Sequence, residues 1–107
     1  MARILLIDTN QFHANRLTAE LQHHNHRVAA ASPEEIRGDL TRILPQFDVV
    51  VVNVTADRQS AWDLLANICQ GAAWLDSGPR VLAVSSVYRG PEARLRAERS
   101  GARLVYD

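Results

Sequence analysis

The sequence predicts an α/β domain in which helices cover a doubly wound, five-stranded parallel sheet. Short apolar runs of strand length alternate with segments of helical period along the whole chain. Residues 49–52 are four consecutive valines, and an uninterrupted β-branched run favours a strand that is buried on both faces. Because consecutive parallel strands need crossover helices, the alternation indicates a parallel sheet.

The first half of the chain supplies two strands before its central strand. Residues 3–7 are a continuous apolar run, and residues 28–31 are a weaker strand. Between them, residues 11–23 should form a helix, since three apolar residues recur on one of its faces. These are Ala14, Leu17 and Leu21.

The segment SPEEIRGDLTRIL, residues 32–44, has the clearest local helix signal. Ser32 is a suitable N-cap, Pro33 occupies the first helical position and Glu35 closes a capping box. An apolar stripe along this helix should face the core. It consists of Ile36, Leu40 and Ile43.

The second half of the chain continues the alternation after the valine strand. Residues 61–69 should be helical, with Leu64, Leu65 and Ile68 directed inward. A loop or frayed helix end, a strand, an arginine-rich helix ended by Gly101 and a last strand follow. Their predicted ranges are 71–79, 81–84, 91–100 and 103–106.

Length and composition limit the possible functions. The chain has 107 residues, enough for one domain with a single core, and 47% of them are hydrophobic. Twelve basic residues, all arginine, balance twelve acidic ones, so no bulk charge attracts nucleic acid or an anionic membrane. Cys69 is the only cysteine and should lie in the core. The apolar N-terminus is too short for a signal peptide or a membrane span, and we expect a soluble, cytoplasmic protein.

Polar residues follow three of the predicted strands. Asp8 comes after the first, Asn53 after the third, and Ser85 with Ser86 after the fourth. Functional groups of doubly wound sheets collect beyond the carboxyl ends of the strands. These residues therefore form the candidate site.

Four blocks of the sequence resemble the response-regulator receiver domain: RILLIDTN, FDVVVVN, VLAVSS and SGARLVYD. The resemblance covers nearly the whole chain. It implies the strand order 2-1-3-4-5 and a flavodoxin-like fold. It also implies a site where an acidic pair holds magnesium, an aspartate accepts phosphate from a histidine kinase, and a hydroxyl and a lysine contact the phosphoryl group.

The residues at the matching positions depart from that chemistry. The acidic pair becomes Asp8 and Thr9, and the phosphoacceptor position is Asn53. An amide nitrogen is not a nucleophile, and a neutral amide oxygen is a poor ligand for a hard cation. The hydroxyl is retained as Ser85, whereas the lysine position would follow Asp107.

Three further positions differ from the family pattern. Asp57 stands where the family usually has proline, and Ala61 where it has glycine. The aromatic switch position aligns with Val105, so Tyr106 lies one residue away and on the opposite face of its strand.

These departures predict a pseudo-receiver that is not an enzyme, has no catalytic residue and needs no metal or cofactor. We expect residues 1–107 to be one receiver-like domain, the N-terminal part of a longer protein, which acts without phosphorylation and regulates a C-terminal output domain such as a transcription factor's. Phosphotransfer from a histidine kinase is not expected. The alternatives are a small-molecule-binding α/β domain, although no glycine-rich turn follows the first strand, and a receiver phosphorylated at Asp57.

The expected partner is a protein or a second copy of the chain, and neither nucleic acid nor a membrane. The candidate interaction surface lies on and beyond helix 91–100 and consists of Arg94, Arg96, Arg99, Arg103 and Tyr106. A solvated helix face is the alternative interpretation. The family's fifth helix is absent from the sequence, which would leave the last two strands bare on one face unless a second subunit covers them.

We expect no binding role for the histidine cluster or for the two tryptophans. His23, His24 and His26 are clustered, but no acidic or cysteine ligand is near them in sequence, so a metal site is not expected. Trp62 and Trp74 flank the third helix and should serve packing.

Overall fold

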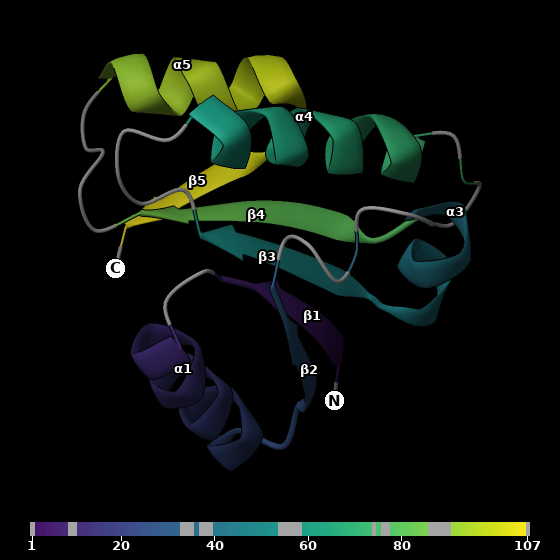
Figure 1. The fold of residues 1–107 in the computed structure, drawn as a ribbon, viewed down its shortest axis with the longest axis vertical. Helices are drawn as coiled ribbons and strands as arrows, with labels where there is room; N and C mark the ends of the chain where they lie inside the picture. Colours follow the sequence, from purple (N-terminus) through teal and green to yellow (C-terminus); the bar gives the residue numbers. More distant parts are fainter. Residues whose placement is uncertain are drawn as a thin grey trace.

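The computed structural model describes residues 2–8, 11–32, 36, 40–53, 59–73, 75, 78–85 and 91–106. Strands and helices alternate along this chain (Figure 1). The strands are β1 (Arg3–Ile7), β2 (Arg27–Ala31), β3 (Val49–Asn53), β4 (Arg80–Ser85) and β5 (Arg103–Tyr106). The helices are α1 (Gln11–His23), α3 (Leu40–Ile43), the 3₁₀ turn η1 (Leu44–Gln46), α4 (Gln59–Ala73) and α5 (Pro91–Ser100).

All the strand pairs are parallel, and the sheet has the order β2-β1-β3-β4-β5. This is the doubly wound order that the family resemblance implies. The order reverses between β1 and β3, which lie side by side with Ile7 opposite Val52. Asp8, which follows β1, and Asn53, the last residue of β3, therefore meet at the carboxyl-terminal end of the sheet.

Helices lie on both faces of the sheet (Figure 1). Because side chains of a strand alternate between faces, β1 sends Leu5 and Ile7 to one core and Ile4 and Leu6 to the other. The first core is covered by α4 and α5, and the second by α1. Burial on both sides explains why the strands are continuous apolar runs rather than alternating ones.

The predicted strands and three of the predicted helices are found with small changes at their ends. Of the helix predicted over residues 32–44, the structure describes helix at residue 36 and in α3, and Leu44 already belongs to the 3₁₀ turn η1. The ranges 11–23, 91–100 and 103–106 are confirmed, and β2, β3 and β4 are each longer than predicted. Helix α4 runs from residue 59 to 73, so the range 61–69 was too short. A Cβ atom at Gly71 would lie 3.1 Å from Leu44 Cδ1, and the glycine lets α4 continue while it packs closely on η1.

The predicted buried faces of the helices are confirmed where the structure describes them. Ala14 of α1 is buried, and Leu64, Leu65 and Ile68 of α4 lie in the core with Cys69 and Trp62. Ile36 is also buried. The capping positions 33 and 35, and Trp74, lie outside the described residues.

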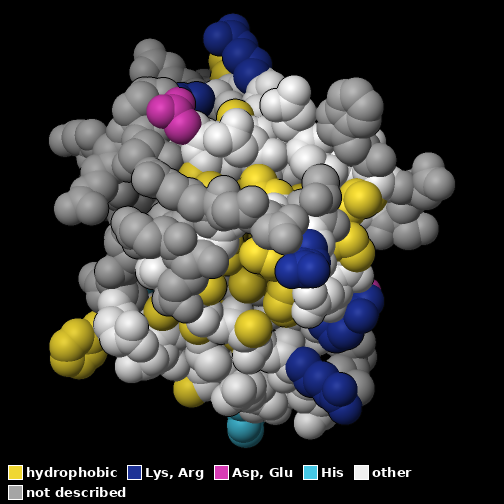
Figure 2. Space-filling view, turned by 45° about the vertical axis from the view of Figure 1, so that its right-hand side comes forward, with side chains coloured by type: hydrophobic (Ala, Val, Ile, Leu, Met, Phe, Trp, Pro, Cys, Tyr) yellow, Lys and Arg dark blue, Asp and Glu magenta, His cyan; other side chains and the backbone are white. Residues whose placement is uncertain are grey.

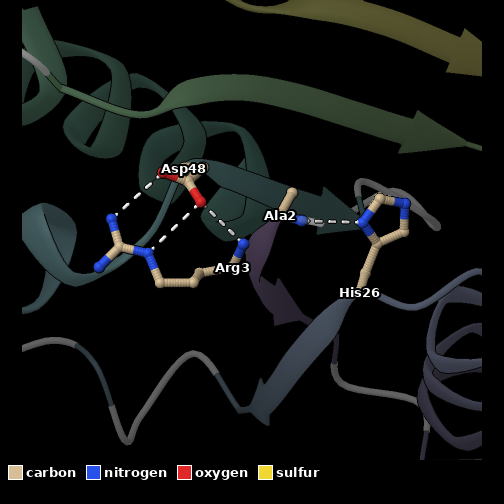
Figure 3. A network of polar contacts seen from close by, with 4 residues as sticks. All are labelled: Ala2, Arg3, His26 and Asp48. Atoms are coloured by element: carbon tan, nitrogen blue, oxygen red, sulfur yellow. Dashed lines mark hydrogen bonds and ion pairs between the residues drawn. The ribbon is translucent and has the colours of Figure 1, made fainter.

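Polar contacts join the strands at the opposite end of the sheet, where the strands begin (Figure 3). The guanidinium of Arg3 donates to both carboxylate oxygens of Asp48, at 3.3 and 3.2 Å, and the Arg3 backbone N–H donates to Asp48 Oδ2 at 2.8 Å. These hydrogen bonds hold the pKa of the Asp48 carboxyl below its usual range and raise that of Arg3. The contacts join the start of β1 to the residue before β3.

One member of the histidine cluster, His26, takes part in these contacts. The backbone N–H of Ala2 donates to Nδ1 of His26 at 3.1 Å, and the rings of His23 and His24 meet edge to face. No group of three or more potential metal ligands occurs among the described residues. In the same part of the chain, no helix has the length and apolar character needed to cross a membrane.

Candidate functional site

Asp8 and Asn53 form the centre of the candidate site, at the carboxyl ends of β1 and β3. The Asn53 side-chain amide donates from Nδ2 to Asp8 Oδ2 at 2.8 Å. Both residues are buried, with 7% and 8% of their surface exposed. The backbone N–H of Asp8 also donates to the Ala31 carbonyl of β2, which fixes the residue just beyond β1. The structure thus brings together two residues that lie 45 positions apart.

The orientation of the Asn53 amide follows from its neighbour. With its oxygen turned toward Asp8, two acceptors would face each other at hydrogen-bonding distance, whereas the NH₂ group can donate to the carboxylate. The amide therefore acts as a hydrogen-bond donor to Asp8 at the carboxyl end of β3.

His13, in the first turn of α1, completes the cluster, which we call the Asp8–His13–Asn53 triad. His13 Nδ1 lies 2.6 Å from Asp8 Oδ2 and 2.8 Å from Asn53 Nδ2. A short contact with a carboxylate oxygen requires a proton between the two atoms, so Nδ1 carries the hydrogen and donates to Asp8. Oδ2 accepts from both neighbours, and the two nitrogens lie close because they converge on the same oxygen.

Burial makes these hydrogen bonds strong. The Asp8 side chain has no exposed surface and that of His13 has 16%. A hydrogen bond to a charged acceptor contributes about 1.5–3 kcal/mol, because a buried carboxylate without donors would lose its hydration uncompensated. The triad therefore fastens the first turn of α1 to the ends of β1 and β3.

Sequence reasoning missed His13. A histidine three residues into a helix has no distinctive local pattern, and it was not among the candidate residues. The available signal was topological: the helix that follows β1 begins above the carboxyl ends of β1 and β3, so polar residues of its first turn can reach Asp8. The polar side chain of His13, in the first turn of that helix, was therefore a candidate for a contact with Asp8.

The polar side chains described at this site are not suitable ligands for the magnesium ion that the fold family implies. Mg²⁺ takes anionic oxygens in a near-octahedral arrangement. Asp8 is the only carboxylate among the described residues at the carboxyl end of the sheet. Its Oδ2 atom already accepts two hydrogen bonds, and Asn53 directs its side-chain nitrogen, not its oxygen, toward Asp8. The nearest polar neighbours of Asp8 Oδ2 are the imidazole Nδ1 of His13 and the amide nitrogen of Asn53, and N–H donors do not coordinate a cation.

The other predicted site residues are placed less completely. Thr9, Ser86 and Asp57 lie outside the described residues. Ser85 is the last residue of β4, opposite Tyr106 of β5, and their side chains are outside the described part. The geometry of the triad therefore rests on one predicted pair, Asp8 and Asn53, and on the unpredicted His13.

The arginines of the predicted interaction surface lie on α5 and at the start of β5. Arg94, Arg96 and Arg99 are exposed, as is Arg103. The Arg96 guanidinium lies over the Trp62 ring of α4, with Cζ 4.6 Å from the ring centroid. Arg96 thus packs between two helices of its own chain and is held in place there.

Comparisons with solved structures find the same fold. The chemotaxis protein CheY4 of Vibrio cholerae matches with a TM-score of 0.77 and 17% identity over 100% of this chain and 85% of that one. The receiver domain of the histidine kinase CKI1 from Arabidopsis thaliana, solved with Mg²⁺ and BeF₃⁻, gives 0.78 and 18% over 98% and 80%. A Burkholderia pseudomallei response regulator with a phosphorylated aspartic acid gives 0.76 and 21%, over 99% of this chain and 59% of that one.

In sequence, no protein-family model matches this chain, and neither does any curated protein. The structural matches, at 17–21% identity, show the fold alone. The chain therefore has the α/β receiver fold with a parallel sheet.

Proposed function

We propose that this chain is a pseudo-receiver: a receiver fold that acts as a protein-interaction module in signalling and does not form an acyl phosphate. One observation carries the proposal. At the phosphoacceptor position, Asn53 donates its amide hydrogen to Asp8 at 2.8 Å instead of offering a nucleophilic oxygen. The module would pass a signal by docking to a partner and would regulate an output domain without being an enzyme.

The chemistry of the triad supports this proposal. A phosphorylatable receiver site gathers carboxylates whose mutual repulsion is relieved by a cation. In this chain an amide and an imidazole replace such groups around Asp8, and both donate to it. Internal hydrogen bonds then compensate the buried charge without a cation.

A phosphodonor experiment tests the proposal. The protein is incubated with acetyl phosphate and Mg²⁺, and its intact mass is measured at neutral pH. We expect no adduct of one phosphoryl group. The variant Asn53→Asp, treated in parallel, shows whether a carboxylate alone restores reactivity, and a known active receiver serves as positive control. An adduct on the unchanged protein would overturn the proposal, and peptide mapping would locate it.

The exposed surface is consistent with a docking role. Figure 2 shows hydrophobic side chains gathered in the middle of one face, with basic side chains above them and to their right. Apolar centres with arginine nearby are typical of protein interfaces. Light scattering on the purified chain distinguishes the two kinds of partner that we propose, because a second copy of the chain would double the mass in solution and a different protein would not.

A further inference from the structure

A groove runs between α4 and α5 on the side turned away from the sheet. It has a volume of about 580 Å³ and is lined by Ala66 of α4 and by Leu95, Arg96, Arg99 and Ser100 of α5. Leu95 is 49% exposed, and the other exposed side chains that the structure describes on α5 are charged. Ala97 is fully buried, so α5 faces the core with the side that carries Ala97 and not with the side that carries Leu95.

The spacing of the groove residues matches the two helices. Leu95 and Arg99 are separated by one turn of α5, and Ala66 lies on α4 beside exposed Asn67 and Gln70. The small side chain of Ala66 leaves room above α4, and the acidic Asp63 is exposed one turn before it. Helix α5 supplies Leu95, Arg96, Arg99 and Ser100, which makes its side of the groove basic.

Arg99 lines the groove, and Arg94 lies on the same helix one residue before Leu95. Arg94 and Arg99 are exposed, and neither has a hydrogen-bonding or ion-pair partner among the described residues. The guanidinium of Arg96 is held over Trp62, which is only 4% exposed. A cation fixed in this way loses less side-chain entropy on binding than a freely moving one.

From these observations we propose that the α4–α5 groove binds an acidic amphipathic helix of a partner protein. An apolar stripe of that helix would cover Leu95 and Ala66, and glutamate or aspartate beside the stripe would pair with Arg94 and Arg99. A helix suits the site because a groove between two packed helices accepts a third with apolar residues at successive turns. The inference rests on the proposed role as an interaction module and names the class of its partner.

A peptide titration followed by NMR tests the groove. The probe is a synthetic helical peptide of about 16 residues, with leucine at every third or fourth position and glutamate on both sides of the leucine stripe. A scrambled peptide of the same composition and a peptide with lysine in place of glutamate are the comparisons. We expect saturable amide shifts on α4 and α5, a Kd below about 1 mM and weaker binding at high salt.

Variants identify the residues that carry the binding. Arg99→Glu should weaken it by about three- to thirtyfold, because an attraction becomes a repulsion, and Arg99→Gln by a smaller factor. Leu95→Ala should weaken it by about three- to tenfold through lost apolar burial. Arg27→Glu, the same charge change on the exposed edge strand β2, is the matched control and should alter the Kd by less than about twofold.

Several results would overturn the inference. These are no saturable shifts, shifts elsewhere on the chain, equal binding of the scrambled peptide, or equal effects of Arg27→Glu and Arg99→Glu. Tighter binding of a short DNA duplex to the same amides would assign the groove to nucleic acid instead. None of these outcomes bears on acetyl phosphate reactivity, and a phosphoryl adduct would not remove peptide shifts at the groove, so the two proposals fail separately.

Discussion

The substitution Asn53→Asp examines the triad directly, because it exchanges a hydrogen-bond donor for an acceptor of almost the same shape. In the native chain Asn53 Nδ2 donates to Asp8 Oδ2 at 2.8 Å, and both residues are more than nine-tenths buried. After the substitution two carboxylate oxygens face each other at that position. The packing volume hardly changes, so any loss of stability comes from the polar contact.

The magnitude follows from two contributions. The lost hydrogen bond to a charged acceptor costs about 1.5–3 kcal/mol. Repulsion of two unit charges 2.8 Å apart would be about 6 kcal/mol at an effective dielectric constant of about 20. Protonating one carboxyl at pH 7 limits that penalty to about 4 kcal/mol, since an ordinary aspartate titrates about three pH units lower. Because the protonated carboxyl would donate to Asp8 in place of the amide, the two contributions are not added together. We expect a destabilisation of about 3–4 kcal/mol for Asn53→Asp and about 1–3 kcal/mol for the control Asn53→Ala.

Urea unfolding in the presence of EDTA measures this difference, with the fluorescence of buried Trp62 as one probe and circular dichroism as another. Acidification to about pH 4.5 should narrow the gap, because a protonated carboxyl can donate to Asp8 as the amide did, whereas Asn53→Ala cannot regain a donor. Equal stability of Asn53→Asp and the native chain at pH 7, or a gap that is unaffected by pH, would refute the arrangement of the triad.

Three further predictions concern other parts of the fold. Burial raises the pKa of the Cys69 thiol from 9.0 to about 11, so the folded state binds the proton more tightly and loses stability as the pH rises from about 9 to about 11; Cys69→Ala should flatten that slope in alkaline unfolding curves. Arg3 lowers the pKa of Asp48, so this carboxylate stabilises the fold above pH 3.8 and less at lower pH, and Asp48→Asn should flatten the acid limb of the stability profile. Gly101 has a φ of +96°, and a Cβ there would lie 3.3 Å from Cys69 Cβ, so Gly101→Ala should destabilise the fold by about 1–2 kcal/mol. Asn25→Gly, at a φ of +66°, should be neutral or stabilising. Chemical denaturation compares the two variants, and equal effects on the free energy of unfolding would contradict this prediction.

The elements of this fold could be predicted from local sequence because their signals are local. The valine run of β3 and the apolar face of α1 each determine an element from neighbouring residues, and their predicted ranges agree closely with the structure. The end of α4 was less predictable: Gly71 indicated a break, yet packing on Leu44 makes a glycine suitable within the helix. That contact joins distant parts of the chain and has no local signal.

By itself the sequence determined the order of strands and helices and the chemical nature of the side chain that ends β3, since an asparagine is an amide in any fold. Only the tertiary structure decided what that amide does. It brought His13 from the first turn of α1 to within 2.6 Å of Asp8 and directed the Asn53 NH₂ group at the same oxygen. It also placed Arg96 on Trp62 rather than free on the surface. Such pairings depend on distances between segments far apart in the chain, which packing of the whole sheet and its helices fixes and which residue patterns along the chain do not encode locally.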